Sequence, residues 1–351
     1  MPKNKFSKIS SIIQDAKKGK MFILVDDKNR ENEGDLVIPG SKCNSKSINF
    51  MAKHGRGLIC LALTKKQVDN LKLPLMSSIN KSRMQTAFTI SIEAKKGITT
   101  GISAKDRAKT IKTAINSKAK KSDIVSPGHV FPLVARNGGV LERAGHTEAS
   151  VDISKLSKLN PSSVICEVMN EDGRMARLND LFKLSKKHKI KLASIEDLIS
   201  YRFKYEKLVF RSGLKSLSIN KIDKLNLHIY KNKLEKNFNF AITKGKFNQK
   251  KSIPVRVLTS KIEGKNITSN KKIKKSLMFM SKYKNFLLLI INNRNNIDKE
   301  NSINTLRYYG IGAQIIKDLN IRNMILVSRS KKKIIGLDGF DLKIKKQIII
   351  R

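Results

Sequence analysis

Short apolar runs separated by polar turns recur along the first 205 residues of the chain. Each run is rich in branched aliphatic residues, which is typical of a buried β-strand. The predicted strands cover residues 21–25, 36–38, 57–63, 86–92, 164–169 and 190–195. Between them, apolar residues at helical spacing predict helices at about 7–18, 47–54, 103–116, 179–188 and 195–203.

A second region begins after Tyr205 and is rich in Lys and Asn. Its apolar runs at 255–258 and 286–291 predict strands. A chain of 351 residues also exceeds the usual size of one hydrophobic core. We therefore predict two domains, 1–205 and 206–351, of the α+β or α/β class. The first would be a mixed sheet flanked by helices, and the second a smaller α/β domain.

An acidic loop joins the first two predicted strands. Five of the 28 acidic residues of the chain fall within ten positions: Asp26, Asp27, Glu31, Glu33 and Asp35. A loop held between two buried strands can direct its carboxylates at one point, for metal binding or proton transfer. A solvated turn, partly neutralised by Arg30, is an equally good interpretation of this loop alone.

Two of the five histidines, His129 and His146, lie within 18 residues of each other in conformationally restricted loops. His129 lies between two prolines, which suits a side chain that must keep its orientation. Arg143, Gly145, His146 and Thr147 bring together a guanidinium, an accessible backbone, an imidazole and a hydroxyl. A sugar phosphate bound beside a metal would require these groups.

Three further features have both a structural and a functional interpretation. Glu167 interrupts an apolar strand, so its carboxylate needs a partner or has a raised pKa suited to acid–base work. The Gly/Thr/Ser turn at 97–107 could bind an anion, but an ordinary helix capped by Ser103 is the favoured interpretation. Cys60, alone in an apolar run, is more typical of a core residue than of a reactive thiol.

The formal charge of +45 suggests a nucleic-acid-binding protein. However, the excess is mostly Lys spread over both regions and accompanied by abundant Ile and Asn, a bias that A-rich codons alone would produce. No motif interleaves the basic residues with aromatic ones. Nucleic-acid binding is therefore not favoured, and solubility is the main physical consequence of the charge.

The remaining composition suggests a cytoplasmic protein. The three cysteines form no CxxC pair, which fits a reducing compartment. Residues 1–8 lack the apolar core of a signal peptide. The apolar run at 286–291 is far shorter than the ~20 residues that span a bilayer, so no membrane association is expected.

Six motifs in the first region resemble, in order and spacing, those of 3,4-dihydroxy-2-butanone 4-phosphate synthase, an enzyme of riboflavin biosynthesis. The motifs lie at 26–35, 54–60, 99–104, 127–132, 143–148 and 166–173. Together they span about residues 5–203. Several multi-residue motifs in register are a far more specific signal than any one of them.

The resemblance implies conversion of D-ribulose 5-phosphate into formate and L-3,4-dihydroxy-2-butanone 4-phosphate by a carbon–carbon lyase. It implies Mg²⁺ or Mn²⁺ as the cofactor, held by Glu31 and His146. The implied catalytic residues are His129, Glu167 and Asp35. The implied substrate contacts are Arg30, Glu31, Asp35, Arg143, Ala144, Gly145, His146, Thr147 and Glu167.

Residues 306–316 and 335–340 resemble the end of GTP cyclohydrolase II, a zinc enzyme whose metal is held by three cysteines. This chain has no cysteine after Cys166, and zinc cannot be held there without thiolates. A run of asparagines at 292–296 stands where the family has its glycine-rich nucleotide segment. We therefore expect no zinc and a degenerate domain.

Two other functions stay open from the sequence: a nucleic-acid-binding protein, and a scaffold for other enzymes of the riboflavin pathway. The resemblance also implies a homodimer with sites near the subunit interface. The order of the proton transfers, a reactive role for Cys60 and GTP binding by the second domain are not decided by the sequence.

Overall fold

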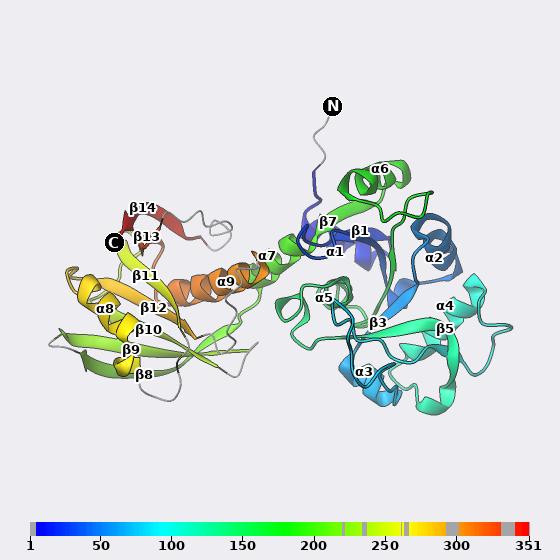
Figure 1. Cartoon of the computed structure of the whole chain (residues 1–351), viewed down its shortest axis with the longest axis horizontal. Coiled ribbons are helices and arrows are strands. Elements are labelled where there is room, and N and C mark those ends of the chain that lie inside the picture. The colour runs from blue at the N-terminus through cyan, green and yellow to red at the C-terminus, as the bar shows by residue number, and fades with distance from the viewer. Residues whose placement is uncertain are drawn as a thin grey trace. The chain divides into compact units, whose positions relative to one another are not determined.

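The computed structural model describes residues 5–219, 222–233, 237–260, 262, 267–292, 302–330 and 341–350, with the backbone alone at 268 and 302–307. The chain forms two compact units, Met1–Ile199 and Ser200–Arg351, which divide within helix α7 (Ile195–Tyr205; Figure 1). Each unit contains its own seven-stranded sheet. This organisation agrees with the predicted pair of α/β-type domains.

The first unit is built on a mixed sheet with strand order β4-β5-β3-β6-β2-β1-β7. The strand bounds are β1 Phe22–Val25, β2 Gly34–Pro39, β3 Cys60–Thr64, β4 Ile92–Ala94, β5 Ile124–Ala135, β6 Ser163–Glu167 and β7 Lys191–Ser194. The pairs β1–β7 and β3–β5 are parallel, and the other pairs are antiparallel. Strands β1 and β2 are buried along their whole length, which explains their continuous apolar runs.

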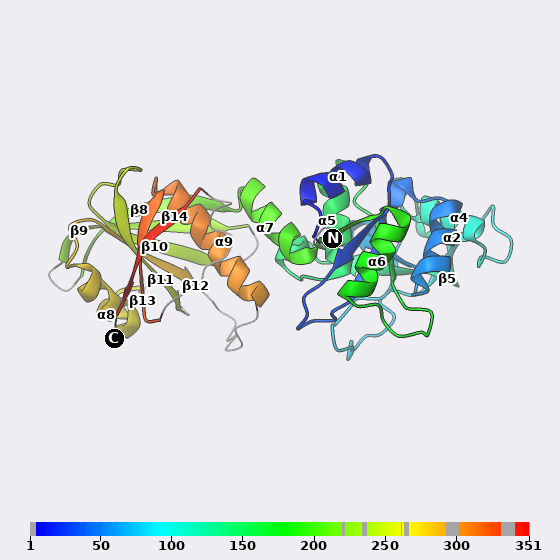
Figure 2. The same ribbon diagram turned by 90° about the horizontal axis from the view of Figure 1, so that it is seen from above.

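Helices cover both faces of this sheet (Figure 2). Helices α1 (Ile9–Lys17) and α5 (His146–Leu156) pack together on one face. The opposite face carries a hydrophobic core built with helices whose bounds are α2 Ser45–Phe50, α3 Lys65–Asn70, α4 Ala104–Ala114 and α6 Leu178–His188. A five-residue π-helix, Met51–Gly55, extends α2.

Most predicted elements of this unit are present, but the strand predicted at 86–92 is wrong in extent. Only Ile92 belongs to a strand, at the start of β4. The preceding residues make isolated bridges instead, Leu75 with Thr89 and Phe88 with Leu133. Their alternating pattern therefore reflects these isolated contacts beside β5, not a ladder of strand pairs.

The second unit is a sheet with strand order β14-β13-β11-β12-β10-β9-β8. The strand bounds are β8 Val209–Ile219, β9 Ile222–Asn232, β10 Phe238–Lys244, β11 Ser252–Ser260, β12 Phe286–Asn292, β13 Asn323–Ser328 and β14 Lys343–Ile349. Strands β8, β9, β10 and β12 pair antiparallel, whereas β12, β11, β13 and β14 pair parallel. The predicted strands at 255–258 and 286–291 are confirmed within β11 and β12.

Two helices enclose the central strand β12, which is buried at every position. Helix α8 (Lys271–Met280) packs into the core cluster that contains Leu288. Helix α9 (Ser302–Asp318) contacts the opposite face, where Gly312 lies against Leu289. The motif predicted at 335–340 and most of the asparagine run at 292–296 lie outside the described residues. Within the described part of the chain, no helix is long and apolar enough to cross a membrane.

The second unit should depend strongly on β12. We expect Leu288→Ala to lower its free energy of unfolding by about 2–5 kcal/mol, because the side chain is fully buried and its loss leaves a cavity. Leu214→Ala is the control, since Leu214 is 57% exposed on β8 and its removal should cost within about 0.5 kcal/mol. Urea unfolding followed by circular dichroism measures both, and equal losses would contradict the packing described.

Candidate active site

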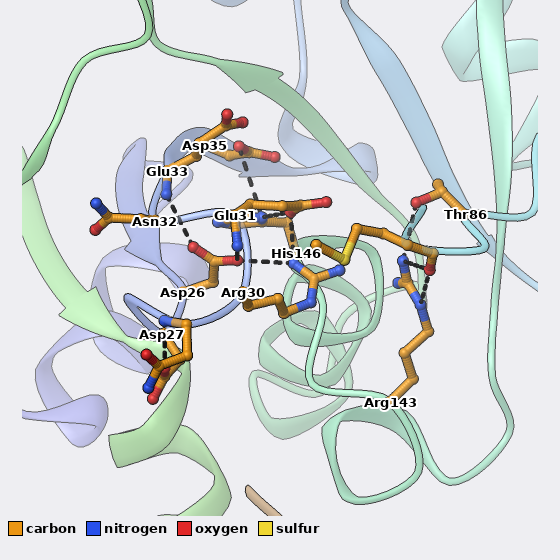
Figure 3. Close-up of polar contacts among 12 residues, drawn as sticks. Asp26, Asp27, Arg30, Glu31, Asn32, Glu33, Asp35, Thr86, Arg143 and His146 are labelled. Carbon is orange, nitrogen blue, oxygen red and sulfur yellow. Dashed lines mark hydrogen bonds and ion pairs between the residues drawn. The ribbon is translucent and has the colours of Figure 1, made fainter. Parts of the chain in front are cut away.

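The acidic loop between β1 and β2 is organised by one buried carboxylate, Asp26 (Figure 3). Its Oδ2 accepts hydrogen bonds from the Glu31 amide at 3.0 Å and the Arg30 guanidinium at 2.8 Å. Its Oδ1 accepts one from the Glu33 amide at 2.9 Å. The Asp26 side chain is 0% exposed, so its charge is balanced almost entirely by these donors. Asp26 therefore holds the loop in a single curved conformation.

His146 faces this loop from the first turn of α5. Gly145 precedes the helix as its N-cap, and His146 is buried. The His146 Nδ1 lies 3.6 Å from Glu31 Oε2 and 3.8 Å from Asp35 Oδ1. The loop and the start of α5 thus bring one imidazole and two carboxylates from distant parts of the sequence together.

The electrostatics of these groups follow from their crowding. Burial raises the pKa of Glu31, but hydrogen bonding to His146 and the charges of Arg30 and His146 outweigh it and lower the pKa to about 2. Burial raises the pKa of Asp35, and nearby Glu167 and Glu31 raise it further against the opposing charge of His146. Burial lowers the pKa of His146, yet the surrounding carboxylates, led by Asp35, raise it overall. The cluster therefore favours a positive charge at its centre.

The donor set suits a divalent cation. Ligand atoms of Asp26, Glu31 and His146 all lie within 4.8 Å of one another. Both oxygens of Asp26 already accept hydrogen bonds, so Glu31 and His146 are the better ligands. Two buried atoms, Asp35 Oδ1 and His146 Nε2, have no hydrogen-bond partner in the part of the chain that the structure describes. Carboxylate oxygens suit hard cations such as Mg²⁺, and the imidazole is a common ligand of divalent metals in general. Such unsatisfied buried atoms are costly without a ligand.

Glu167 lies beside Asp35, because the two residues pair directly across β6 and β2. The Glu167 Oε2 accepts a hydrogen bond of 2.9 Å from the Leu58 amide. Gly57 packs so closely on Glu167 that a Cβ there would lie 2.5 Å from its carbonyl oxygen and 2.6 Å from Oε2. The glycine at position 57 is therefore required for Glu167 to adopt this position.

Arg143 is held in place by a buried partner that the sequence reasoning missed. Its Nη1 donates to Glu148 Oε2 at 2.6 Å, and Glu148 is only 1% exposed. Its Nη2 donates to Thr86 Oγ1 at 2.9 Å and to the Met84 carbonyl at 3.0 Å. Arg143 thus connects the 84–86 segment to α5. The available signal for Glu148 was its place at the end of the 143–148 motif, whereas helix α5 itself was not predicted.

His129 lies on β5, away from the hydrogen bonds and ion pairs of the acidic loop. Cys60 of β3 pairs with both Phe131 of β5 and Ile165 of β6. Strand β5 runs parallel to β3, so His129, which precedes Phe131, lies past the Cys60 end of β3. Strand β6 runs antiparallel to β3, so Glu167, which follows Ile165, lies past the same end. The strand register therefore places His129 and Glu167 at the same end of the strands.

For two features that the sequence left open, the observed contacts indicate a structural role. Ser103 caps α4 by accepting from the Asp106 amide, as predicted. Asp106 in turn accepts hydrogen bonds from Thr99 and Gly101, so the turn is filled by the chain's own carboxylate. Cys60 is buried in β3, and burial together with the charges of Glu167 and Asp35 raises the pKa of its thiol. These contacts agree with the interpretations favoured from the sequence.

Comparison with known proteins places this site in a family. Residues 10–201 match the family model of 3,4-dihydroxy-2-butanone 4-phosphate synthase, and residues 214–349 match that of GTP cyclohydrolase II. Riboflavin biosynthesis protein RibBA of Aquifex aeolicus is 43% identical, over 99% of this chain and 93% of its own. A synthase of Photobacterium phosphoreum is 42% identical, over 96% and 98%. The chain belongs to the 3,4-dihydroxy-2-butanone 4-phosphate synthase family.

Solved structures agree with this assignment. The two-domain synthase RibBX of A. baumannii is 36% identical with a TM-score of 0.83, covering 98% of this chain and 99% of its own. A synthase solved in complex with two magnesium ions is 37% identical with a TM-score of 0.55, covering 57% of this chain and 98% of its own. The chain is thus a lyase of riboflavin biosynthesis with a synthase unit and a cyclohydrolase-II-like unit.

Most residues predicted for the synthase site lie around two neighbouring elements, the acidic loop and the start of α5. The contacts described above connect Arg30, Glu31, Asp35 and His146 directly. Ala144 and Thr147 are buried beside His146 in the chain. Glu167 joins the group through its pairing with Asp35.

The organising role of Asp26 can be tested on the synthase by Asp26→Asn. An amide has a single acceptor oxygen, so one set of donors loses its partner and the amide nitrogen faces another donor. We expect formate release from ribulose 5-phosphate to fall by about 10- to 100-fold, as for other groups that orient ligands.

The matched control is Asp27→Asn. Its side-chain oxygen accepts from the Asn29 amide at 2.7 Å, and an asparagine can do the same. Activity close to that of the unsubstituted protein is expected for this variant, with circular dichroism showing that both proteins fold. Equal activity of the two variants would contradict the role given to Asp26.

Proposed function

We propose that the synthase reaction, conversion of D-ribulose 5-phosphate into L-3,4-dihydroxy-2-butanone 4-phosphate and formate, takes place between the acidic loop and the start of α5. The observation that supports this most directly is the convergence of Glu31, Asp35 and His146, where two buried polar atoms have no hydrogen-bond partner among the described residues. Such a site is unstable unless a ligand completes it.

Glu31 and His146 would hold a divalent cation, Mg²⁺ or Mn²⁺. When bound, the cation supplies the positive charge that a ketose carbonyl needs as it becomes an enediolate. Arg30 contributes a guanidinium that is fixed by Asp26 and Glu31. In our proposal, Arg30 binds a substrate hydroxyl while its two carboxylate partners keep it in position.

The reaction needs several proton transfers, because it includes an enolisation, the loss of a hydroxyl and the release of formate. Asp35 and Glu167 lie side by side on β2 and β6, so two carboxylates can serve adjacent carbon atoms of one substrate. His129, at the same end of the strands, is the third candidate for proton transfer. We assign proton transfer to these three residues without ordering their steps.

The phosphate group would bind at the start of α5. Arg143, Ala144, Gly145 and Thr147 surround the helix N-terminus, where backbone N–H groups and the helix dipole favour an anion. Arg143 is already tied to Glu148, so its guanidinium is oriented before the substrate arrives. A fixed guanidinium loses little conformational entropy when it binds a phosphate.

We further propose that residues 206–351 form a domain that does not hydrolyse GTP and holds no zinc. The reason is chemical: the family's zinc requires three thiolates, and no cysteine follows Cys166. The full-length relative from Photobacterium phosphoreum, named only as a synthase, and the two-domain synthase RibBX support this reading. The family assignment does not favour the nucleic-acid-binding or scaffold alternatives. A homodimer and a cytoplasmic location stay predictions.

Formate release from ribulose 5-phosphate tests the activity, measured with Mg²⁺, with Mn²⁺ and after treatment with EDTA. GTP turnover in the presence of zinc is measured in parallel on the same preparation. We expect metal-dependent formate release and no GTP turnover. Formate release that survives EDTA would refute the role of the cation, and GTP turnover would refute the inactive second domain.

The metal ligands are tested by Glu31→Gln. Loss of the carboxylate should abolish formate release and weaken Mn²⁺ binding, measured by electron paramagnetic resonance, by about 10-fold or more. Glu171→Gln is the control, because the Glu171 side chain is 90% exposed in a turn. If Glu31→Gln bound Mn²⁺ as tightly as the control, Glu31 would not be a ligand.

A further inference from the structure

Glu93 is a carboxylate that neither the sequence motifs nor the family assignment singles out, and it contacts His129 directly. Glu93 lies on β4, which pairs antiparallel with β5, the strand that carries His129. One oxygen of Glu93, Oε1, contacts the His129 Nδ1. The Glu93 side chain is 15% exposed and the His129 side chain 45%, so the carboxylate lies on the protein side of the imidazole.

The side chain of Glu93 sits in a slot between two glycines. Gly101 has a φ of +85°, and a Cβ at this position would overlap the Glu93 carboxylate. A Cβ at Gly128, next to His129, would overlap the Ile92 backbone and then the Glu93 Cγ. A side chain at position 101 would therefore displace the carboxylate, and one at position 128 would displace the segment of β4 that carries Glu93.

The walls of this slot are fixed by hydrogen bonds from other elements. The Gly101 amide donates to Asp106 Oδ2 of α4 at 3.1 Å. The Gly128 amide donates to Ser91 Oγ at 3.1 Å. An exposed ion pair is worth little to stability and does not require such a fitted site. This close packing is typical of a side chain that must keep one orientation, here Glu93 against His129.

The contact has a defined chemical consequence for the imidazole. A carboxylate accepts but does not donate, so the Nδ1 of His129 must carry the proton. In the neutral ring, Nε2 is then the atom that can accept a proton. A carboxylate behind a histidine fixes its tautomer and orientation in this way in hydrolase triads.

We propose that Glu93 is the positioning residue of His129: it holds the Nδ1–H tautomer and directs Nε2 toward the substrate. This inference rests on the proposed role of His129 in proton transfer. Glu93 does not touch the reacting atoms in this assignment. It acts only through the imidazole.

The test compares Glu93→Gln, Glu93→Asp and His129→Gln in the full-length protein. Glu93→Gln can donate to Nδ1 and so permits the opposite tautomer. We expect it to lower kcat by about 100-fold, the lower end of the contribution of general acid–base catalysis, with KM nearly unchanged. Glu93→Asp keeps a carboxylate and should recover part of that loss. Formate release gives both parameters.

The tautomer itself is read from nitrogen-15 correlation spectra of the histidine rings. The signal of His129 is assigned as the one absent from His129→Gln. In the unsubstituted protein we expect the Nδ1–H form, and in Glu93→Gln a shift toward Nε2–H. A merely structural ion pair would change stability without this change. Glu206→Gln, which removes a partly buried carboxylate from an ion pair in the second unit, is the control.

The outcomes separate this inference from the proposed function. If His129→Gln keeps full activity, the role of His129 fails and the inference fails with it. If His129→Gln is inactive while Glu93→Gln keeps both its kcat and the Nδ1–H tautomer, only the inference about Glu93 is overturned. If Glu93→Gln does not fold, Glu93→Asp takes its place: a reduced kcat that accompanies a loss of the Nδ1–H form supports the inference, and a normal kcat with the opposite tautomer overturns it.

Discussion

The synthase unit depends on the burial of several carboxylates around a single imidazole. The charges of Glu31 and Glu167 raise the pKa of Asp35, and the charge of His146 opposes them. The charges of Asp35 and Glu31 in turn raise the pKa of His146, the positive group among them. Taking carboxylates out of water costs several kcal/mol each unless opposite charge and hydrogen bonds compensate. In this unit neighbouring residues supply the opposite charge: Arg30 on the loop pairs with Asp26, and His146 faces the carboxylates from the start of α5. A bound cation would complete the compensation.

The scaffold holds these charges by fixed elements instead of flexible side chains. The pairing of β2 with β6 puts Asp35 opposite Glu167, and a register slip of one residue would leave the two side chains on opposite faces of the sheet. Asp26 fixes the loop through backbone amides. Gly57 permits the approach of Glu167, as Gly101 and Gly128 permit that of Glu93. A rigid surrounding of this kind lowers the reorganisation that a reaction requires.

The second unit matches the GTP cyclohydrolase II family, although no cysteine follows Cys166 in the sequence. Its open sheet is centred on β12, whose residues are buried on both faces by α8 and α9. Its described contacts are hydrophobic packing and hydrogen bonds, such as Tyr230 donating to Asp318 at 2.7 Å. None of these contacts involves a thiolate. The core therefore does not require the zinc ligands that we propose the unit lacks.

The sequence by itself determined the strands and helices of strong periodicity, the two-unit organisation and the motif residues from Arg30 to Glu167. These features are local, because they depend on the spacing of apolar residues and on the residue types within short segments. The predicted strand at 86–92 failed because its alternation arises from contacts with residues far along the chain. Only the tertiary structure decided that Asp26 organises the loop, that Glu148 holds Arg143 and that Glu93 faces His129. The pairing of Glu93 with His129 joins residues 36 positions apart through the register of β4 and β5, which no local pattern records. The partners of Asp26 and Glu148 are close in sequence, but only the fold decides which of the neighbouring polar groups face them.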